Sequence, residues 1–160
     1  MNKFKKFKVA TIIILSLAII MCNFTNVEAK KISKQNISDI YNFACDKLWN
    51  SGFCDMNWYC TERTNSIGQK MNPEKKMKKI KKYMSDAKKW DKVVKSLKGK
   101  KYKKLKKEWG IIYSESKRMY EELQKLDFEE MENDPDIKYD LKVNKFQNHL
   151  YKLMDAAYSL

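Results

Sequence analysis

The spacing of apolar residues in the second half of the chain is the feature that most limits its fold. Between residues 101 and 131, one seam with a single polar member steps by three and four: Tyr102, Leu105, Trp109, Ile112, Ser116, Met119, Leu123 and Leu126. Beyond residue 136, a second seam has the same steps: Tyr139, Val143, Phe146, Leu150, Leu153, Ala157 and Leu160. Heptad spacing of this kind predicts two long helices, over about 101–131 and 136–158.

Two more helices are predicted nearer the N-terminus. The tripeptide Asn72-Pro73-Glu74 places a capping residue, a proline and an acid where a helix begins, and Gly99 ends the apolar pattern that follows. A shorter helix over about 38–50 is indicated by apolar residues at helical spacing, and Ser51-Gly52 predicts its end.

No segment alternates with the period of a strand, and the whole chain holds only two prolines and four glycines. Because the turns between the last three helices are short, neighbouring helices are expected to run antiparallel. We therefore predict an all-α fold, an up-down antiparallel helical bundle of three long helices plus a shorter first helix. In the main variant, the first helix packs across one end of a three-helix bundle.

The first 29 residues carry the pattern of a secretory signal peptide. Four lysines precede an uncharged, mainly apolar run of 13 residues, Val9–Met21, and Val27-Glu28-Ala29 resembles a cleavage site. The run is shorter than the roughly 20 residues of a membrane-spanning helix, so we expect no transmembrane helix in the mature chain. We predict a signal peptide over 1–29, a loose segment over 30–36, a single domain over 37–160, and a secreted or cell-surface location. Lipid attachment at Cys22 is the alternative, although Met21 is bulkier than the residue that usually precedes a lipidated cysteine.

Three cysteines remain after the predicted cleavage, Cys45, Cys54 and Cys60. In an oxidising compartment two of them are expected to form a disulfide, and the sequence leaves the pairing open. A zinc site built from these cysteines and His149 would have enough ligands but lacks the spacing of a zinc knuckle. We therefore predict no metal and no cofactor.

The segment 52–71 breaks the helical periodicity and is long for a connection in a small helical domain. It carries three aromatic residues, Phe53, Trp58 and Tyr59, beside two of the cysteines. These aromatic side chains are predicted either to cap one end of the bundle or to form an exposed interaction loop for a protein or glycan partner.

Positive charge is concentrated in one part of the chain. The net charge is +14, and residues 70–108 hold 18 lysines against four acids, whereas residues 109–160 hold seven basic and eleven acidic residues. In an antiparallel pair of helices, Lys75–Lys82 would lie beside the acids of Glu121–Glu132, which would neutralise them. The opposite end has no such partner, and its candidate binding residues are Lys88, Lys92, Lys95, Lys98, Lys100, Lys101, Lys103, Lys104 and Lys107.

This end is expected to bind an anionic cell-envelope polymer, a lipid surface or an acidic protein, in a secreted module without enzymatic activity. A lysine face that is merely solvated is the alternative interpretation. A second hypothesis is a protein-interaction factor, such as an inhibitor or immunity-type protein, that uses the aromatic segment, and a small enzyme is the third.

No residue is singled out as catalytic, and His149 is expected to be a packed or surface residue. Only two of the 34 basic residues are arginines, Arg63 and Arg118. Recognition of nucleic-acid bases relies on the planar fork of arginine, which lysine cannot replace. The composition therefore argues against nucleic acid as the partner.

Overall fold

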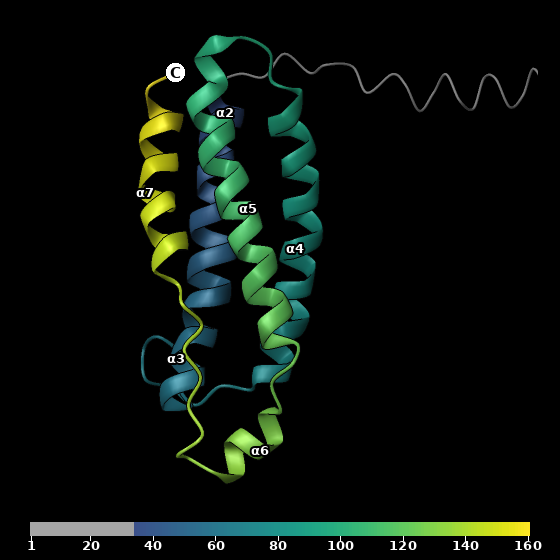
Figure 1. Ribbon diagram of the computed structural model, residues 1–160, viewed down its shortest axis with the longest axis vertical. Helices are drawn as coiled ribbons and strands as arrows, with labels where there is room; N and C mark the ends of the chain where they lie inside the picture. The colour runs from purple at the N-terminus through teal and green to yellow at the C-terminus, as the bar shows by residue number, and fades with distance from the viewer. Residues whose placement is uncertain (1–33) are drawn as a thin grey trace, which may run out of the picture. The chain divides into compact units, whose positions relative to one another are not determined.

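Residues 34–160 form helices joined by short links, and these are the residues that the computed structural model describes (Figure 1). The first helical run consists of α2 (Lys34–Asn42), the π-helix η1 (Phe43–Phe53) and α3 (Cys54–Glu62). It is followed by α4 (Pro73–Ser96), the 3-10 turn η2 (Lys100–Tyr102), α5 (Lys103–Leu123), α6 (Phe128–Asn133) and α7 (Asn144–Tyr158). Within this range the only strand-like pairing is an isolated bridge between Thr64 and Lys70, so the predicted all-α class is confirmed.

The four long helical stretches run alternately up and down in a bundle (Figure 1). α5 contacts α4 and α7, and the first run contacts α4 through η1 and α7 through α2. Helices that follow one another along the chain are therefore antiparallel neighbours. We predicted a shorter first helix. The first helical run is instead long, because α2, η1 and α3 continue without a break from Lys34 to Glu62.

The core of the bundle draws side chains from all four stretches. Phe53 of the first run, Ile80 of α4, Trp109 of α5 and Phe146 of α7 are all at most 1% exposed. The ring of Phe146 stacks on Trp49 with centroids 5.7 Å apart and meets Phe53 edge-on at 6.3 Å. Burying one side chain of this size contributes about 1.5–3 kcal/mol, so these contacts fix the pairing of the helices.

The start of α4 confirms the prediction made from its sequence. The side chain of Asn72 accepts a hydrogen bond from the N–H of Lys75 at 2.7 Å, and Pro73 occupies the first turn. Both features stabilise a helix N-terminus, since the cap satisfies a free N–H and proline has none to satisfy.

The first run continues through its predicted end at residue 51 because its middle is a π-helix. The N–H of Cys54 bonds to the carbonyl of Trp49, five residues back, where an α-helix would bond four residues back. The wider turn changes which residues face the core, and the buried ones are Ala44, Leu48, Gly52 and Phe53. The prediction of a helix that ends near residue 50 is therefore wrong.

The last two predicted helices also differ in their ends. α5 stops at Leu123, and Asp127 begins the short α6 by accepting hydrogen bonds from the N–H groups of Glu129 and Glu130 at 3.1 and 3.0 Å. Residues 134–143 form a non-helical segment that leads to α7, although we predicted that the last helix would begin at about residue 136. We call residues 134–143 the strap.

Arg63 holds the first half of the strap. It stands in a left-handed conformation at the C-terminal cap of α3, with φ of 60°. Its side chain donates to the carbonyls of Met131 at 2.6 Å and Asp134 at 3.4 Å, and to the carbonyl of Ile137. The strap carbonyls that a helix would satisfy internally are thus bound by a side chain from another element.

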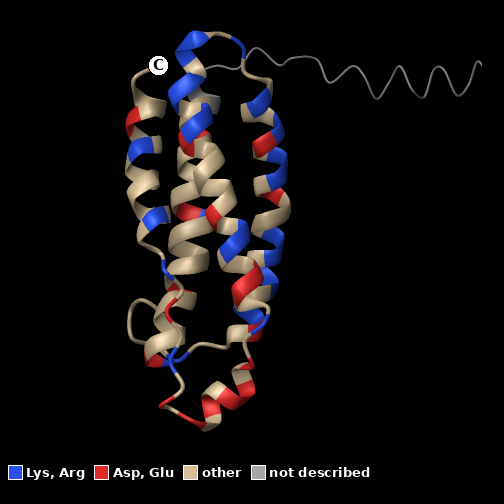
Figure 2. Cartoon of the chain, in the orientation of Figure 1, with Lys and Arg blue, Asp and Glu red and all other residues tan. Residues whose placement is uncertain are grey.

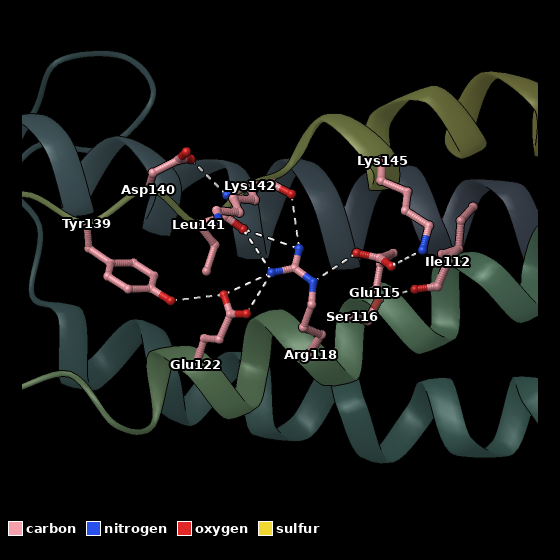
Figure 3. Close-up of polar contacts among 10 residues, drawn as sticks. All are labelled: Ile112, Glu115, Ser116, Arg118, Glu122, Tyr139, Asp140, Leu141, Lys142 and Lys145. Atoms are coloured by element: carbon pink, nitrogen blue, oxygen red, sulfur yellow. Dashed lines mark hydrogen bonds and ion pairs between the residues drawn. The ribbon is translucent and has the colours of Figure 1, made fainter.

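Arg118 of α5 holds the second half of the strap (Figure 3). Its guanidinium donates to the carbonyls of Leu141 and Lys142 at 3.3 and 3.0 Å and pairs with Glu115 at 2.9 Å. Lys145 of α7 pairs with the other oxygen of Glu115 at 2.7 Å. Burial raises the pKa of Glu115, but the hydrogen bonds and charges of Lys145 and Arg118 lower it more, so this pKa lies below its usual value.

The predicted disulfide is not formed, and Cys45, Cys54 and Cys60 are free thiols. Cys54 and Cys60 both lie on α3, six residues apart, which is about 9 Å along a helix. A disulfide requires Cα atoms within about 7 Å of each other. Cys45 lies further back along the same run, so a continuous helix excludes every bridge among the three cysteines.

The predicted signal peptide over 1–29, the alternative lipidation site Cys22 and residues 30–33 lie outside the described residues. Residues 34–36, which we predicted to be loose, belong to α2. In the part of the chain from residue 34 onward, no helix combines the length and the apolar character needed to cross a membrane.

Candidate functional site: a basic tip and an aromatic groove

The turn between α4 and α5 gathers exposed lysines at one end of the bundle (Figure 2). Gly99 turns the chain with φ of 108°, a conformation that glycine adopts readily, and η2 then leads into α5. All nine lysines that the sequence singled out between residues 88 and 107 are exposed. We call the six of them at the turn itself the basic tip: Lys98, Lys100, Lys101, Lys103, Lys104 and Lys107.

Few contacts involve the basic tip. Within residues 34–160, no lysine of the basic tip takes part in an ion pair. The ammonium of Lys101 lies 4.8 Å from the ring centre of Tyr102, a cation–π contact. Next to the tip, Lys95 pairs with Asp91 at 2.6 Å, and this hydrogen bond and charge raise the pKa of Lys95.

The two acids closest to the tip in sequence are buried and engaged. Asp91 is 7% exposed and Glu108 is 4% exposed. Glu108 Oε2 lies 2.5 Å from Nδ1 of His149 on α7, a contact between helices that sequence spacing could not reveal. Because each carboxylate already has a partner, neither offsets the exposed lysines of the basic tip at the surface.

The acids of residues 121–132 lie at the opposite end of the bundle (Figure 2). A hollow there is lined by Glu74 and by residues 125–129, so the start of α4 adjoins the link between α5 and α6. The ion pairs that we predicted between Lys75–Lys82 and these acids are absent from residues 34–160.

Lys76 pairs instead with Asp55 of α3 at 2.5 Å, because the first run extends far enough to reach the start of α4. Burial raises the pKa of Asp55, but hydrogen bonds from Lys76 and Ser66 lower it more, so this pKa lies below its usual value. We did not predict this pair, because Asp55 lies in the segment 52–71, for which the sequence predicted only a connection that contains a short helix or turn tied by a disulfide.

The predicted interaction loop of Phe53, Trp58 and Tyr59 is helical, and most of it is core. Phe53 is fully buried and Tyr59 is 1% exposed, whereas Trp58 is 45% exposed. The hydroxyl of Tyr59 donates to Glu132 at 3.2 Å, and burial raises the pKa of Tyr59 to about 12. The aromatic platform is thereby reduced to Trp58, which weakens the hypothesis of a protein-interaction factor.

A second surface, which sequence analysis missed, is a groove of about 620 Å³ between η1 and the middle of α4. Its walls combine three aromatic rings with charged residues. We call it the aromatic groove, and it is lined by Phe43, Lys47, Lys82, Tyr83, Asp86, Lys89, Trp90 and Val93. The groove lies between two helices that are distant in sequence, and the π-helix determines which residues of η1 face it. Local sequence patterns therefore do not predict the groove.

Comparisons with protein-family models, with curated proteins and with solved structures found no match. Within residues 34–160, no group of histidine, cysteine, aspartate and glutamate is arranged to hold a metal ion. The function is therefore inferred from the two surfaces described above.

Proposed function

We propose that the protein is a secreted, non-enzymatic helical-bundle module that binds an anionic polymer or lipid surface of the cell envelope through the basic tip. The observation that carries the proposal is the exposure of six lysines at one turn, with no ion pair to any of them within residues 34–160. Lysines at i,i+4 spacing on α5, such as Lys103 and Lys107, repel each other by about 0.2–0.5 kcal/mol. An anionic partner would remove this repulsion and would gain the attraction.

The physical chemistry of lysine suits such a partner. Each lysine near an anionic membrane contributes about 1 kcal/mol, and the attraction falls off within a Debye length of about 10 Å at 0.1 M salt. An ammonium group binds phosphate as a point charge and does not require a fixed geometry. The acidic residues at the opposite end of the bundle would be repelled by the same surface, so the tip would face the surface.

The test measures how much of the chain sediments with vesicles of phosphatidylglycerol and phosphatidylcholine at low and at high salt. We expect retention on anionic vesicles that is lost at about 0.5 M salt, since the charges are exposed. Vesicles of phosphatidylcholine alone report any contribution of the apolar run in residues 9–21. Soluble polyphosphate should compete if phosphate groups are what the tip recognises, whether they come from a polymer or from a lipid.

Two matched variants locate the binding surface. The quadruple substitution of Lys100, Lys103, Lys104 and Lys107 by glutamine should abolish most of the retention. The same number of exposed lysines at the other end of α4, Lys75, Lys78, Lys79 and Lys81, should be replaceable by glutamine with little effect. Equal losses in both variants, or retention that does not depend on salt, would contradict the proposal.

A further inference from the structure

The aromatic groove is long enough to hold an extended hydrocarbon chain of about twelve carbons. On α4 its lining runs from Lys82 to Val93, eleven residue steps that correspond to about 16 Å along a helix. On the facing wall, η1 supplies Phe43 and Lys47. The two walls run antiparallel, so one end of the groove combines the start of η1 with the later part of the α4 lining.

The apolar end of the groove is formed where Phe43 faces Trp90, with ring centroids 6.2 Å apart. Phe43 also lies 6.4 Å from the ring of the buried Trp109, so it is supported from below by the core. Val93 extends the same apolar surface by one turn of α4. This end can hold a hydrocarbon chain or a ring.

The other end of the groove is cationic. Lys47 lies one turn further along η1 than Phe43, and Lys82 lies at the start of the α4 lining. Within residues 34–160 neither lysine takes part in an ion pair, whereas the one acid of the lining, Asp86, is paired with Lys89 at 2.7 Å. The lining therefore keeps two positive charges without a partner, both away from its apolar end.

The π-helix is an independent sign that this wall has a function. Turns with i→i+5 hydrogen bonds are rare, occur mostly as single turns, and are frequent at functional sites. Here the π-helix spans 11 residues, and it turns Phe43 and Lys47 toward the groove while Ala44 and Leu48 remain in the core. A less stable backbone conformation is thus kept along one wall of the groove.

We propose that the aromatic groove binds an anionic amphiphile, a single hydrocarbon chain that ends in an acid group. The acid group lies between Lys47 and Lys82, and the chain crosses the ring of Tyr83 to reach Phe43, Trp90 and Val93. Charge complementarity selects an acid head group, and the apolar end selects a hydrocarbon tail. The proposal does not depend on the basic tip, because none of the six lysines of the tip lines the groove.

The first test is a calorimetric titration of the chain with laurate below its micelle concentration. We expect saturable binding of one laurate per chain and no such binding of dodecyltrimethylammonium, which has the same chain length and the opposite charge. The double variant Lys47→Gln/Lys82→Gln should bind laurate several-fold to about thirtyfold more weakly, since two exposed charge contacts contribute up to about 1 kcal/mol each. The matched variant Lys78→Gln/Lys79→Gln, whose lysines are exposed on the same helix outside the groove, should bind as the unmodified chain does.

The second test locates the tail. The bromine of 12-bromododecanoate quenches nearby tryptophans, so it should quench the emission of Trp90, and this part of the quenching should disappear in Trp90→Phe. Val93→Glu should weaken laurate binding by placing a carboxylate at the apolar end. The proposal is overturned if both lysine variants bind laurate equally, if the cationic amphiphile binds as well as laurate, or if Trp90→Phe leaves the quenching unchanged. The lysine variants replace only exposed side chains and should fold, so they decide the test even if Val93→Glu fails to fold.

Discussion

At the scale of single residues, the two arginines have a role that no lysine within residues 34–160 shares. Both hold the strap, since Arg63 binds the carbonyls of residues 134 and 137 as well as that of Met131 in α6, and Arg118 binds the carbonyls of residues 141 and 142. A guanidinium presents five donors in a planar fork, and one side chain can therefore satisfy several carbonyls at once. In a chain that uses lysine for almost every other positive charge, this geometry explains why arginine stands at these two positions.

The substitution Arg63→Lys tests this explanation. A lysine ammonium at position 63 could reach only some of the carbonyls that Arg63 binds, so the others would lose their partner. We expect the free energy of unfolding to fall by about 2 kcal/mol, measured by urea denaturation followed by circular dichroism. The matched exchange Lys70→Arg, on an exposed side chain, should change it by less than about 0.5 kcal/mol. An unchanged urea midpoint for Arg63→Lys would show that the hydrogen bonds specific to the guanidinium of Arg63 contribute nothing to stability.

At the scale of the helices, local signals predicted the elements whose ends depend on local chemistry. The start of α4 follows from Asn72 and Pro73, and its end follows from Gly99. The strap was missed because its conformation depends on Arg63 and Arg118, which are distant in sequence. The first run was missed because a π-helix changes the period of the apolar pattern, and a change of period resembles the end of a helix.

Replacement of glycine by alanine is predicted to change the stability of the protein in opposite directions at two positions. Replacing a helical glycine by alanine normally stabilises a protein by up to about 1 kcal/mol. This is expected for Gly110→Ala in α5, because a Cβ at that position would meet no atom within 4 Å. At Gly52 a Cβ would lie 2.9 Å from the carbonyl oxygen of Lys47, so Gly52→Ala should destabilise the bundle by about 1–3 kcal/mol.

Thermal unfolding of the two alanine variants measures both effects. A raised midpoint for Gly110→Ala with a lowered one for Gly52→Ala would support the close approach inside η1. If Gly52→Ala were as stable as Gly110→Ala, the first run would have to be an ordinary α-helix at that point.

At the scale of the whole molecule, the separation of charge was accessible from the sequence, because it needs only the antiparallel order of α4 and α5. The lysines of the tip and the acids of residues 121–132 do lie at opposite ends of the bundle (Figure 2). The individual ion pairs could not be predicted from the sequence. Lys76–Asp55 and His149–Glu108 each join two helices, and the sequence does not show which faces of those helices meet. The aromatic groove was missed for the same reason.

This separation of charge also affects stability. Replacing Lys100, Lys103, Lys104 and Lys107 by glutamine removes like-charge neighbours at the N-terminus of α5, where cations oppose the helix dipole. We expect the free energy of unfolding to rise by about 1 kcal/mol at low ionic strength and the gain to shrink as salt is added. The matched glutamine variant of Lys75, Lys78, Lys79 and Lys81 should gain less, because acidic residues lie at that end. Equal gains in urea denaturation would refute the view that the acids of residues 121–132 offset the lysines at the start of α4.

The positions of the three thiols have a consequence for oxidation. A sulfur–sulfur bond between any two of Cys45, Cys54 and Cys60 cannot exist in the same molecule as an intact helix from Lys34 to Glu62, so forming one would require that helix to unwind. Cys60 is buried, which raises the pKa of its thiol to about 12 and protects it from alkylation while that helix is intact. The rate at which iodoacetamide labels Cys60 would therefore report how often the N-terminal part of the domain opens.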